Sequence, residues 1–343
     1  MSVFLGIMES SDICVGSIIH QTSICVSYLF KIILVQRKKE INMKKRERFD
    51  IHADDYGVSL NGAEDILECL KEGALDSFSV IPNMSCFEKC VERYAQEKEQ
   101  FVKLPLVTVH LNIMDGRPLL KKEEVPDLVD EDGFFSLTWG KLFFLNYSIG
   151  AKKRRVKEQL KKEFLAQTEA VEKAFGLREI RLDSHQHPHM IPFVFDVLME
   201  ICDEKKGNVT FVRVAKEPLL PFLSKVSLYP TYSPANLVKN VLLNLYSVGA
   251  IKKLKKRGLD YELMWGLVMS GYMDEKRTQE LLPFMERAAK KKGKKLEILF
   301  HPGLMSESEK TEEYRKEGFY KFYCSRNRLE EKKAVKKLQE ILK

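Results

Sequence analysis

EIRLDSHQHPHMIP, at residues 179–192, joins a β-rich run to three closely spaced histidines and then to a proline at which a helix can begin. Asp183, His185 and His187 alternate, so in an extended segment their side chains would share one face. Pro188 is expected to end the strand and to turn the third histidine toward the rim. Three histidines within five residues are hard to explain by packing, so this stretch indicates a functional site at the end of a strand.

The same pattern, a short β-rich run followed by a helical segment, recurs along the chain. Seven such runs occur, at 48–53, 76–82, 106–112, 179–185, 209–214, 263–270 and 296–301. Apolar spacing predicts helices over 155–176, from Pro192 to about residue 206, and over about 274–292. This alternation predicts an α/β protein with a parallel sheet, open or closed, and seven strands suit a barrel-like closure.

Two long segments interrupt this alternation, at 117–150 and 217–258. Connections of this length are uncommon unless they form lids or binding elements. Both segments are rich in apolar or aromatic residues, and both end in basic clusters. One interpretation is local core beside a solvated basic face. The other is a pair of lid-like insertions that cover a substrate near anionic groups.

Composition limits the class of protein. Of the 343 residues, 44% are apolar, which is enough for a real core and too much for a disordered chain. The net charge of +8 is small against 106 charged residues, and no nucleic-acid-binding motif accompanies it, so we expect no nucleic-acid partner. Seven scattered cysteines argue against a disulfide framework and predict reduced thiols in a cytoplasmic protein.

The first 42 residues do not follow the strand–helix pattern. Residues 24–35 are mostly apolar, but the run is shorter than a membrane span, contains Lys31 and is followed by a basic cluster. A weak membrane anchor is one interpretation. We favour the other, a disordered or non-native extension with the natural start at Met43, so that 43–343 forms a single domain without stable membrane insertion.

Metal-binding and acid–base side chains fall at the ends of several predicted strands. Asp54 and Asp55 end the first run, His110 ends the third and His301 ends the last. Because ligand sites in parallel α/β folds lie at these strand ends, the side chains are expected to converge. Imidazole with carboxylate is a typical ligand set for Zn²⁺, Mn²⁺ or Co²⁺. Adjacent strand residues point opposite ways, so Asp54 and Asp55 need not share a role.

Five motifs in this order resemble those of the YdjC-like carbohydrate deacetylases, which include chitooligosaccharide deacetylases. They are HADDYGVS (52–59), VHLNIMDGRPL (109–119), LDSHQHPHMIP (182–192), VRVAKEP (212–218) and LFHPG (299–303). The resemblance implies a distorted (β/α) barrel related to the polysaccharide deacetylases. It also implies a metal-dependent hydrolase that removes N-acetyl groups from an amino sugar or a short N-acetylated oligosaccharide, with Mg²⁺ as the usual ion.

The resemblance also implies a role for individual residues. Asp55, His110 and His185 would be the metal ligands. Asp54 would be the general base that takes the proton of the attacking water, and His301 would assist the leaving amine or the oxyanion. Around them we expect three groups that support the ligands or contact substrate: Asp183, His187 and His189.

Two other functions stay open at this stage. One is a different metal-dependent hydrolase, such as a phosphoesterase, although such sites usually need more ligands than this chain offers. The other is a non-catalytic sugar-binding protein on the same scaffold, which a missing base or ligand would favour. The insertions at 117–150 and 217–258 match no motif, so the particular sugar is undetermined. The oligomeric state is also open, including a homodimer.

Overall fold

The computed structural model describes residues 45–342. Residues Arg48–Lys343 form one compact unit, and a short 3₁₀ helix, η1 (Lys45–Arg48), precedes the first strand. The expected extension at 1–42 lies outside the described residues, so that expectation stays a prediction. Among the helices of the described part, none is both long enough and apolar enough to cross a membrane.

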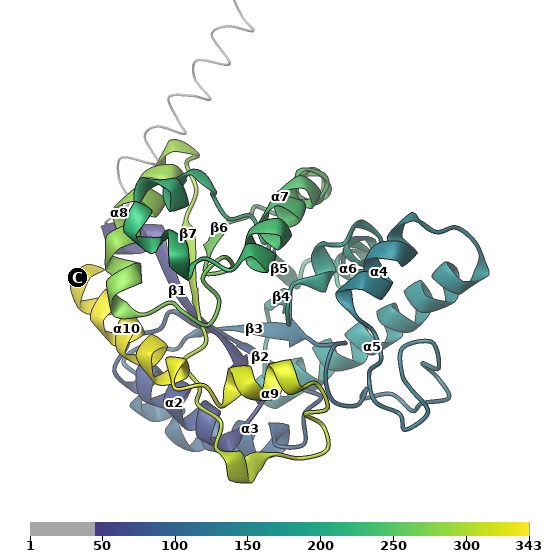
Figure 1. The fold of residues 1–343 in the computed structure, drawn as a ribbon. Coiled ribbons are helices and arrows are strands. Elements are labelled where there is room, and N and C mark those ends of the chain that lie inside the picture. The colour runs from purple at the N-terminus through teal and green to yellow at the C-terminus, as the bar shows by residue number, and fades with distance from the viewer. Residues whose placement is uncertain (1–44, 343) are drawn as a thin grey trace, which may run out of the picture. The chain divides into compact units, whose positions relative to one another are not determined.

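Seven parallel strands form one sheet that curls into a half-barrel (Figure 1). They are β1 (Phe49–Tyr56), β2 (Ser77–Val80), β3 (Leu106–Leu111), β4 (Ile180–Ser184), β5 (Val209–Val212), β6 (Leu263–Trp265) and β7 (Leu296–Phe300). Their order is β5-β4-β3-β2-β1-β7-β6. The two edges approach each other where the Met264 N–H donates to the Lys216 carbonyl, 3.0 Å away. The predicted distorted barrel of seven strands is confirmed.

One predicted strand is shorter than its apolar run. The run at 263–270 is extended only over Leu263–Trp265. Gly266 then adopts a φ of +142°, and a Cβ at that position would lie 2.5 Å from the Leu299 carbonyl oxygen. The remaining apolar residues therefore pack as a turn over the end of β7 rather than as a strand.

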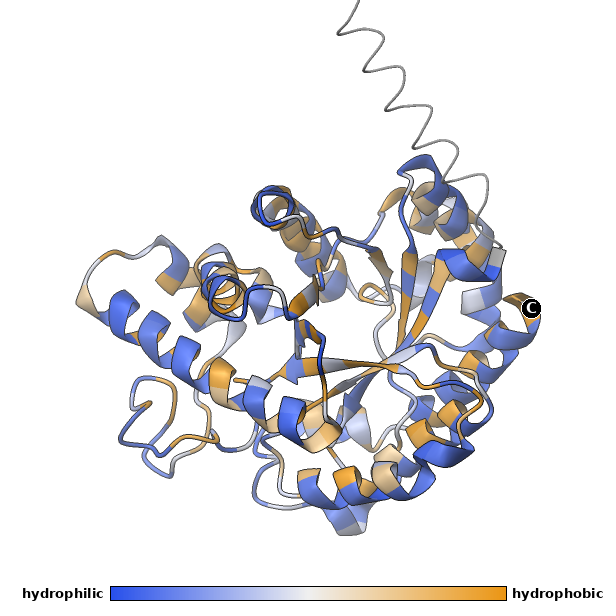
Figure 2. Cartoon of the chain, turned by 180° about the vertical axis from the view of Figure 1, so that it is seen from behind, coloured by the Kyte–Doolittle hydropathy of each residue, from blue (hydrophilic) through white to orange (hydrophobic). Residues whose placement is uncertain are grey.

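Helices surround the sheet and bury apolar faces against it (Figure 2). They include α2 (Leu60–Lys71), α3 (Phe87–Glu97), α5 (Ala151–Phe175), α6 (Pro192–Glu204), α8 (Glu275–Lys291) and α10 (Asn327–Leu342). The three predicted helices correspond to α5, α6 and α8. The Asp274 carboxylate accepts the Arg277 N–H at the start of α8, and Gly176 ends α5 in the left-handed conformation.

The two interrupting segments carry helices of their own. The first contains α4 (Trp139–Tyr147), and the second contains α7 (Pro234–Lys255). The two helices lie side by side, because the Tyr147 and Tyr246 hydroxyls are 3.2 Å apart. The remaining short elements are η2 (Lys98–Gln100), η3 (Pro188–Met190), η4 (Leu220–Ser224), η5 (Val226–Thr231), η6 (Glu307–Glu309) and α9 (Glu317–Tyr323).

Candidate metal centre and its cavity

A cavity of about 290 Å³ opens at the carboxyl ends of the strands. Most of the residues that the sequence singled out line it: Asp54, Asp55, His110, His185, His187 and His301. Asp55, His110 and His185 each offer one ligand atom within 4.8 Å of the others. One ion could therefore contact all three, as the resemblance implies. Asp183 and His189 lie outside the cavity lining.

The end of β1 places the Asp55 side chain. The register between β1 and β2 shifts between Ala53 and Tyr56, and Asp55 takes a positive φ of 71°. An irregularity of this kind redirects a side chain at the end of a strand. The Asp55 Oδ1 atom comes within 2.9 Å of His185 Nδ1 and 3.4 Å of His110 Nε2. Its second oxygen is buried without a hydrogen-bond partner among the described residues.

A buried carboxylate orients the His110 ring. His110 Nδ1 lies 2.5 Å from Asp183 Oδ1, so its Nε2 atom is the one that faces Asp55. A carboxylate behind a histidine is the usual way to fix a ring for metal binding. Burial alone would lower the pKa of His110, but the Asp183 and Asp54 carboxylates outweigh burial and raise the pKa to about 10. The site therefore has a surplus of negative charge that favours a cation.

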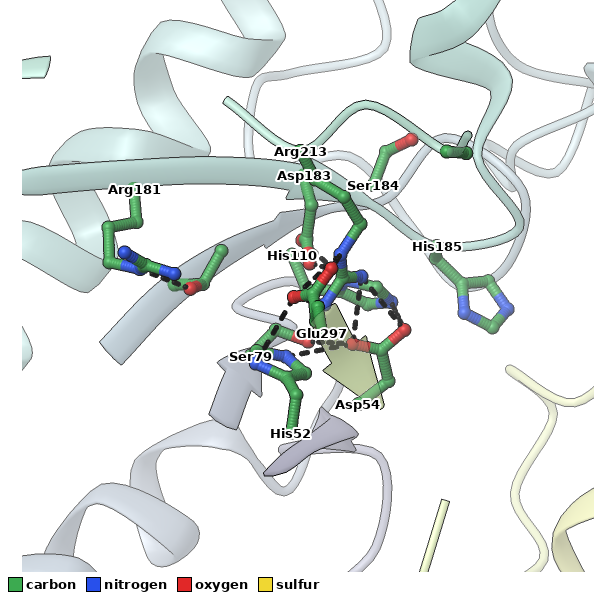
Figure 3. Close-up of polar contacts among 12 residues, drawn as sticks. His52, Asp54, Ser79, His110, Arg181, Asp183, Ser184, His185, Arg213 and Glu297 are labelled. Atoms are coloured by element: carbon green, nitrogen blue, oxygen red, sulfur yellow. Dashed lines mark hydrogen bonds and ion pairs between the residues drawn. The ribbon is translucent and has the colours of Figure 1, made fainter. Parts of the chain in front are cut away.

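Asp54 belongs to a buried ion cluster around Arg213, which sequence reasoning did not assign to the site (Figure 3). Arg213 NH1 lies 3.0 Å from Asp54 Oδ1 and 2.5 Å from Asp183 Oδ2, and NH2 lies 2.9 Å from Glu297 Oε1. Burial would raise the pKa of Asp54, but Arg213 and the nearby histidines hold it well below its usual range.

The same cluster accounts for a second group of potential ligands. His52, Asp54 and Asp183 also offer atoms within 4.8 Å of one another. The Arg213 guanidinium already contacts both carboxylates of this group, and the His52 Nδ1 atom lies 2.6 Å from the Ser77 hydroxyl. Because the Arg213 guanidinium already pairs with both carboxylates, this group supports Asp54 and is less suited to an ion than Asp55, His110 and His185.

The three histidines after β4 point in different directions. The extended geometry that the sequence suggested for 183–187 is wrong beyond Ser184, because β4 ends there and His187 takes a left-handed φ of 61°. His185 faces Asp55, with the Tyr323 hydroxyl 3.3 Å from its Nε2 atom. His187 lines the cavity, and burial together with Lys239 and Arg213 holds its pKa well below the usual value.

His189 lies behind the cavity instead of at its rim. Its Nδ1 atom is 2.5 Å from the Ser184 hydroxyl, and its Nε2 atom is 3.0 Å from the Arg213 carbonyl oxygen. The ring is fully buried, and burial lowers its pKa to about 4. His189 therefore links the end of β4 to the segment that carries Arg213, and does so as a neutral ring.

His301 is positioned by the last helix of the chain. Its backbone N–H donates to Glu331 Oε2 at 2.6 Å, and its Nδ1 atom lies 3.7 Å from the same oxygen. The Phe322 ring packs edge-on against the imidazole, with 5.1 Å between centroids. Arg328 and His301 lower the pKa of Glu331 despite its complete burial. No motif in the sequence marked Glu331.

The second insertion lines the cavity, and the first packs against residues of its wall. From the second, Asn236 and Lys239 of α7 line it, and burial lowers the pKa of Lys239 to about 8. From the first, the Trp139 indole N–H donates to the Gln186 carbonyl, and its ring lies under the Lys239 ammonium. The C-terminal region adds a further wall of Lys316, Phe319 and Phe322. The sequence marked these segments as interruptions but did not indicate which of their residues face the site.

The chain belongs to the family described as YdjC-like protein, whose model matches residues 48–337. It is 29% identical over 195 residues to a carbohydrate deacetylase of Geobacillus stearothermophilus, a stretch covering 57% of this chain and 71% of the relative. It is 26% identical over 157 residues to a chitooligosaccharide deacetylase of Yersinia enterocolitica, covering 45% and 55%. The resemblance inferred from the motifs is confirmed at the level of the family.

A solved structure shares the fold. It is a putative cellobiose-phosphate cleavage protein from Enterococcus faecalis, with a TM-score of 0.56 and 18% identity. The match covers 86% of this chain and 92% of that one. At this identity the likeness supports the half-barrel architecture alone.

Proposed function

We propose that this protein is a metal-dependent deacetylase that removes the N-acetyl group from an amino sugar or a short N-acetylated oligosaccharide. The observation that carries the proposal is the convergence of Asp55, His110 and His185 within 4.8 Å, beside Asp54, on the wall of one cavity. Membership of a family whose distant relatives are carbohydrate deacetylases supports the substrate class. The cavity volume of about 290 Å³ is at the small end for ligand sites, which favours a short substrate.

The residues present fit a divalent ion. Asp55 has a buried oxygen without a partner among the described residues, and the contact from Asp183 leaves His110 Nε2 free to bind. An ion held by these groups would lower the pKa of a bound water and polarise the acyl carbonyl. Two imidazoles and one carboxylate favour Zn²⁺, Mn²⁺ or Co²⁺ on donor chemistry, whereas family resemblance favours Mg²⁺.

In this proposal the chain's own groups move the protons. Asp54 is ionised at neutral pH and accepts the proton of the attacking water. Its pairing with Arg213 makes it a weak base, so it suits only a water that is already acidified. His301, held by Glu331 on the same cavity, donates a proton to the departing amine.

The test is acetate release from N-acetylated sugars by the purified full chain. We expect release that EDTA abolishes and that one of Mg²⁺, Zn²⁺, Mn²⁺ or Co²⁺ restores. An Asp55→Asn variant should release none. Hydrolysis of an aryl phosphate without acetate release would replace the proposal with a phosphoesterase. Sugar binding without turnover under every metal would replace it with a binding protein.

A further inference from the structure

The outer face of α7 is apolar, and its inner face is partly polar. Val238, Val241, Leu245 and Val248 follow one stripe of the helix, and their exposed fractions are 72%, 48%, 66% and 68%. The buried stripe contains Asn240 and Ser247. The buried stripe also holds Leu243, Ala250 and Leu254, so α7 is apolar on both faces, whereas an ordinary surface helix is polar on its outer face.

Polar contacts explain which face of α7 packs against the strand ends. Asn240 Nδ2 donates to Glu217 at 2.6 Å, and Lys216 Nζ donates to the Ser247 hydroxyl at 2.9 Å. Glu217 also accepts three backbone N–H groups from residues 266–268. The inner face is thus fixed to the strand ends, and the apolar stripe is left outward.

The neighbouring helix also carries exposed apolar side chains. On α4 and the turn after it, Phe144, Tyr147 and Ile149 are 74%, 64% and 97% exposed. The Tyr147–Tyr246 contact and the Trp139–Lys239 contact hold α4 beside α7. We call these seven exposed side chains, four on α7 and three on or after α4, the α4–α7 surface. It borders the cavity, because Asn236 and Lys239 in the first turns of α7 line the cavity wall.

The two segments that carry this surface contain only basic charges, four of which pair with acidic residues elsewhere in the chain: Arg155, Lys157, Lys253 and Arg257. Residues 133–157 contain six Lys or Arg and residues 218–258 contain seven, and neither segment contains Asp or Glu. Without these thirteen, the rest of the chain has 44 basic and 49 acidic residues. The stripe on α7 continues into Lys252 and Lys255, and Lys152 and Arg154 follow Ile149. The net positive charge of the protein thus comes from the two segments that carry this surface.

We propose that the α4–α7 surface docks on an anionic lipid bilayer. A helix with apolar side chains along one stripe and lysines at its end can lie in the interface, with the apolar groups among the acyl chains and the amines near the headgroups. Anionic lipids attract such basic clusters. A second copy of this chain is a poorer partner, because a symmetric interface would bring two basic surfaces together.

Docking in this way would bring the cavity, which the first turns of α7 line, close to the headgroups. An amino sugar carried on a lipid could then enter it without leaving the membrane. This consequence rests on the proposed function, whereas vesicle binding does not, so the two can fail separately.

The experiment is sedimentation of the full-length chain with vesicles of phosphatidylcholine alone or mixed with phosphatidylglycerol. We expect binding to the anionic vesicles that weakens at high salt. A K252Q/K255Q/K256Q variant should bind about 100-fold more weakly, at roughly fivefold for each lysine near the surface. An L245N/V248N variant should bind at least tenfold more weakly.

Two matched controls lie outside the α4–α7 surface. K290Q/K291Q/K292Q makes the same charge change at the end of α8, and V102N/L104N replaces exposed apolar residues before β3. Both should bind as the unchanged chain does, and circular dichroism should show all variants folded. The proposal would be overturned if the α4–α7 variants and the controls bound the anionic vesicles equally well. That result is expected if residues 1–42 carry the binding. The proposal would also be overturned if the protein bound no vesicles and instead formed a dimer that the L245N/V248N substitutions dissociate.

Discussion

Replacing Arg213 with methionine should destabilise the fold severely. The guanidinium contacts Asp54, Asp183 and Glu297 at 2.5–3.0 Å, and all four side chains are at most 3% exposed. Methionine has similar length but no charge, so three buried carboxylates would lose their common partner. Removing one partner of a buried ion pair costs about 3–5 kcal/mol, and here we expect a loss near the upper end at pH 7.

Urea unfolding of the purified variants at pH 7 and pH 5 measures this loss. Lower pH should reduce it, because protonating one carboxylate relieves the repulsion. A double variant, Arg213→Met with Glu297→Gln, should be more stable than the single variant, since only two carboxylates then remain unpaired. The control is Arg155→Met, which breaks an exposed pair with Asp127 and should cost less than about 1 kcal/mol. A cost for Arg213→Met as small as the control's would refute the reasoning.

Four further predictions concern the site and its supports. Asp55→Asn should lose bound metal, whereas Asp54→Asn should keep the metal and lose roughly 10²–10⁴-fold in turnover. Metal analysis and acetate release measure the two effects, and the opposite pattern would reverse the two roles. Replacing His187 or His189 with Ala should reduce turnover more than metal content, and parallel losses of both would contradict this. The pKa of His189 is lowered from 6.5 to about 4, so between these pH values the unfolded chain binds more protons than the folded chain. The free energy of unfolding should therefore fall as pH drops below 6.5, by about 2 kcal/mol at pH 5. In urea titrations, His189→Asn should flatten this dependence. A chain beginning at Met43 should fold and keep full activity, and loss of either would show that residues 1–42 belong to the native protein.

The sequence by itself determined the strands and the place of the chemistry. Alternating β-rich and helical runs are local patterns, and each of the seven predicted runs contains a strand, although β6 ends at Trp265, before its run does. Parallel strands share a carboxyl edge, so residues at the ends of runs, such as Asp55, His110 and His185, had to meet. The place of the metal-binding side chains could therefore be predicted without knowing the order in which the strands pair.

Only the tertiary structure decided which groups support these residues and how they point. Arg213 lies 159 residues from Asp54 and 84 from Glu297, and no local pattern connects them. The direction of the histidines after β4 depends on a left-handed turn at Gln186 and His187 that the alternation of residues did not reveal. The orientation of α7 depends on contacts of Asn240 and Ser247 with Glu217 and Lys216, which the pattern within the helix did not indicate. Closure of the half-barrel sets such contacts between distant segments, whereas sequence periodicity reports only on neighbours along the chain.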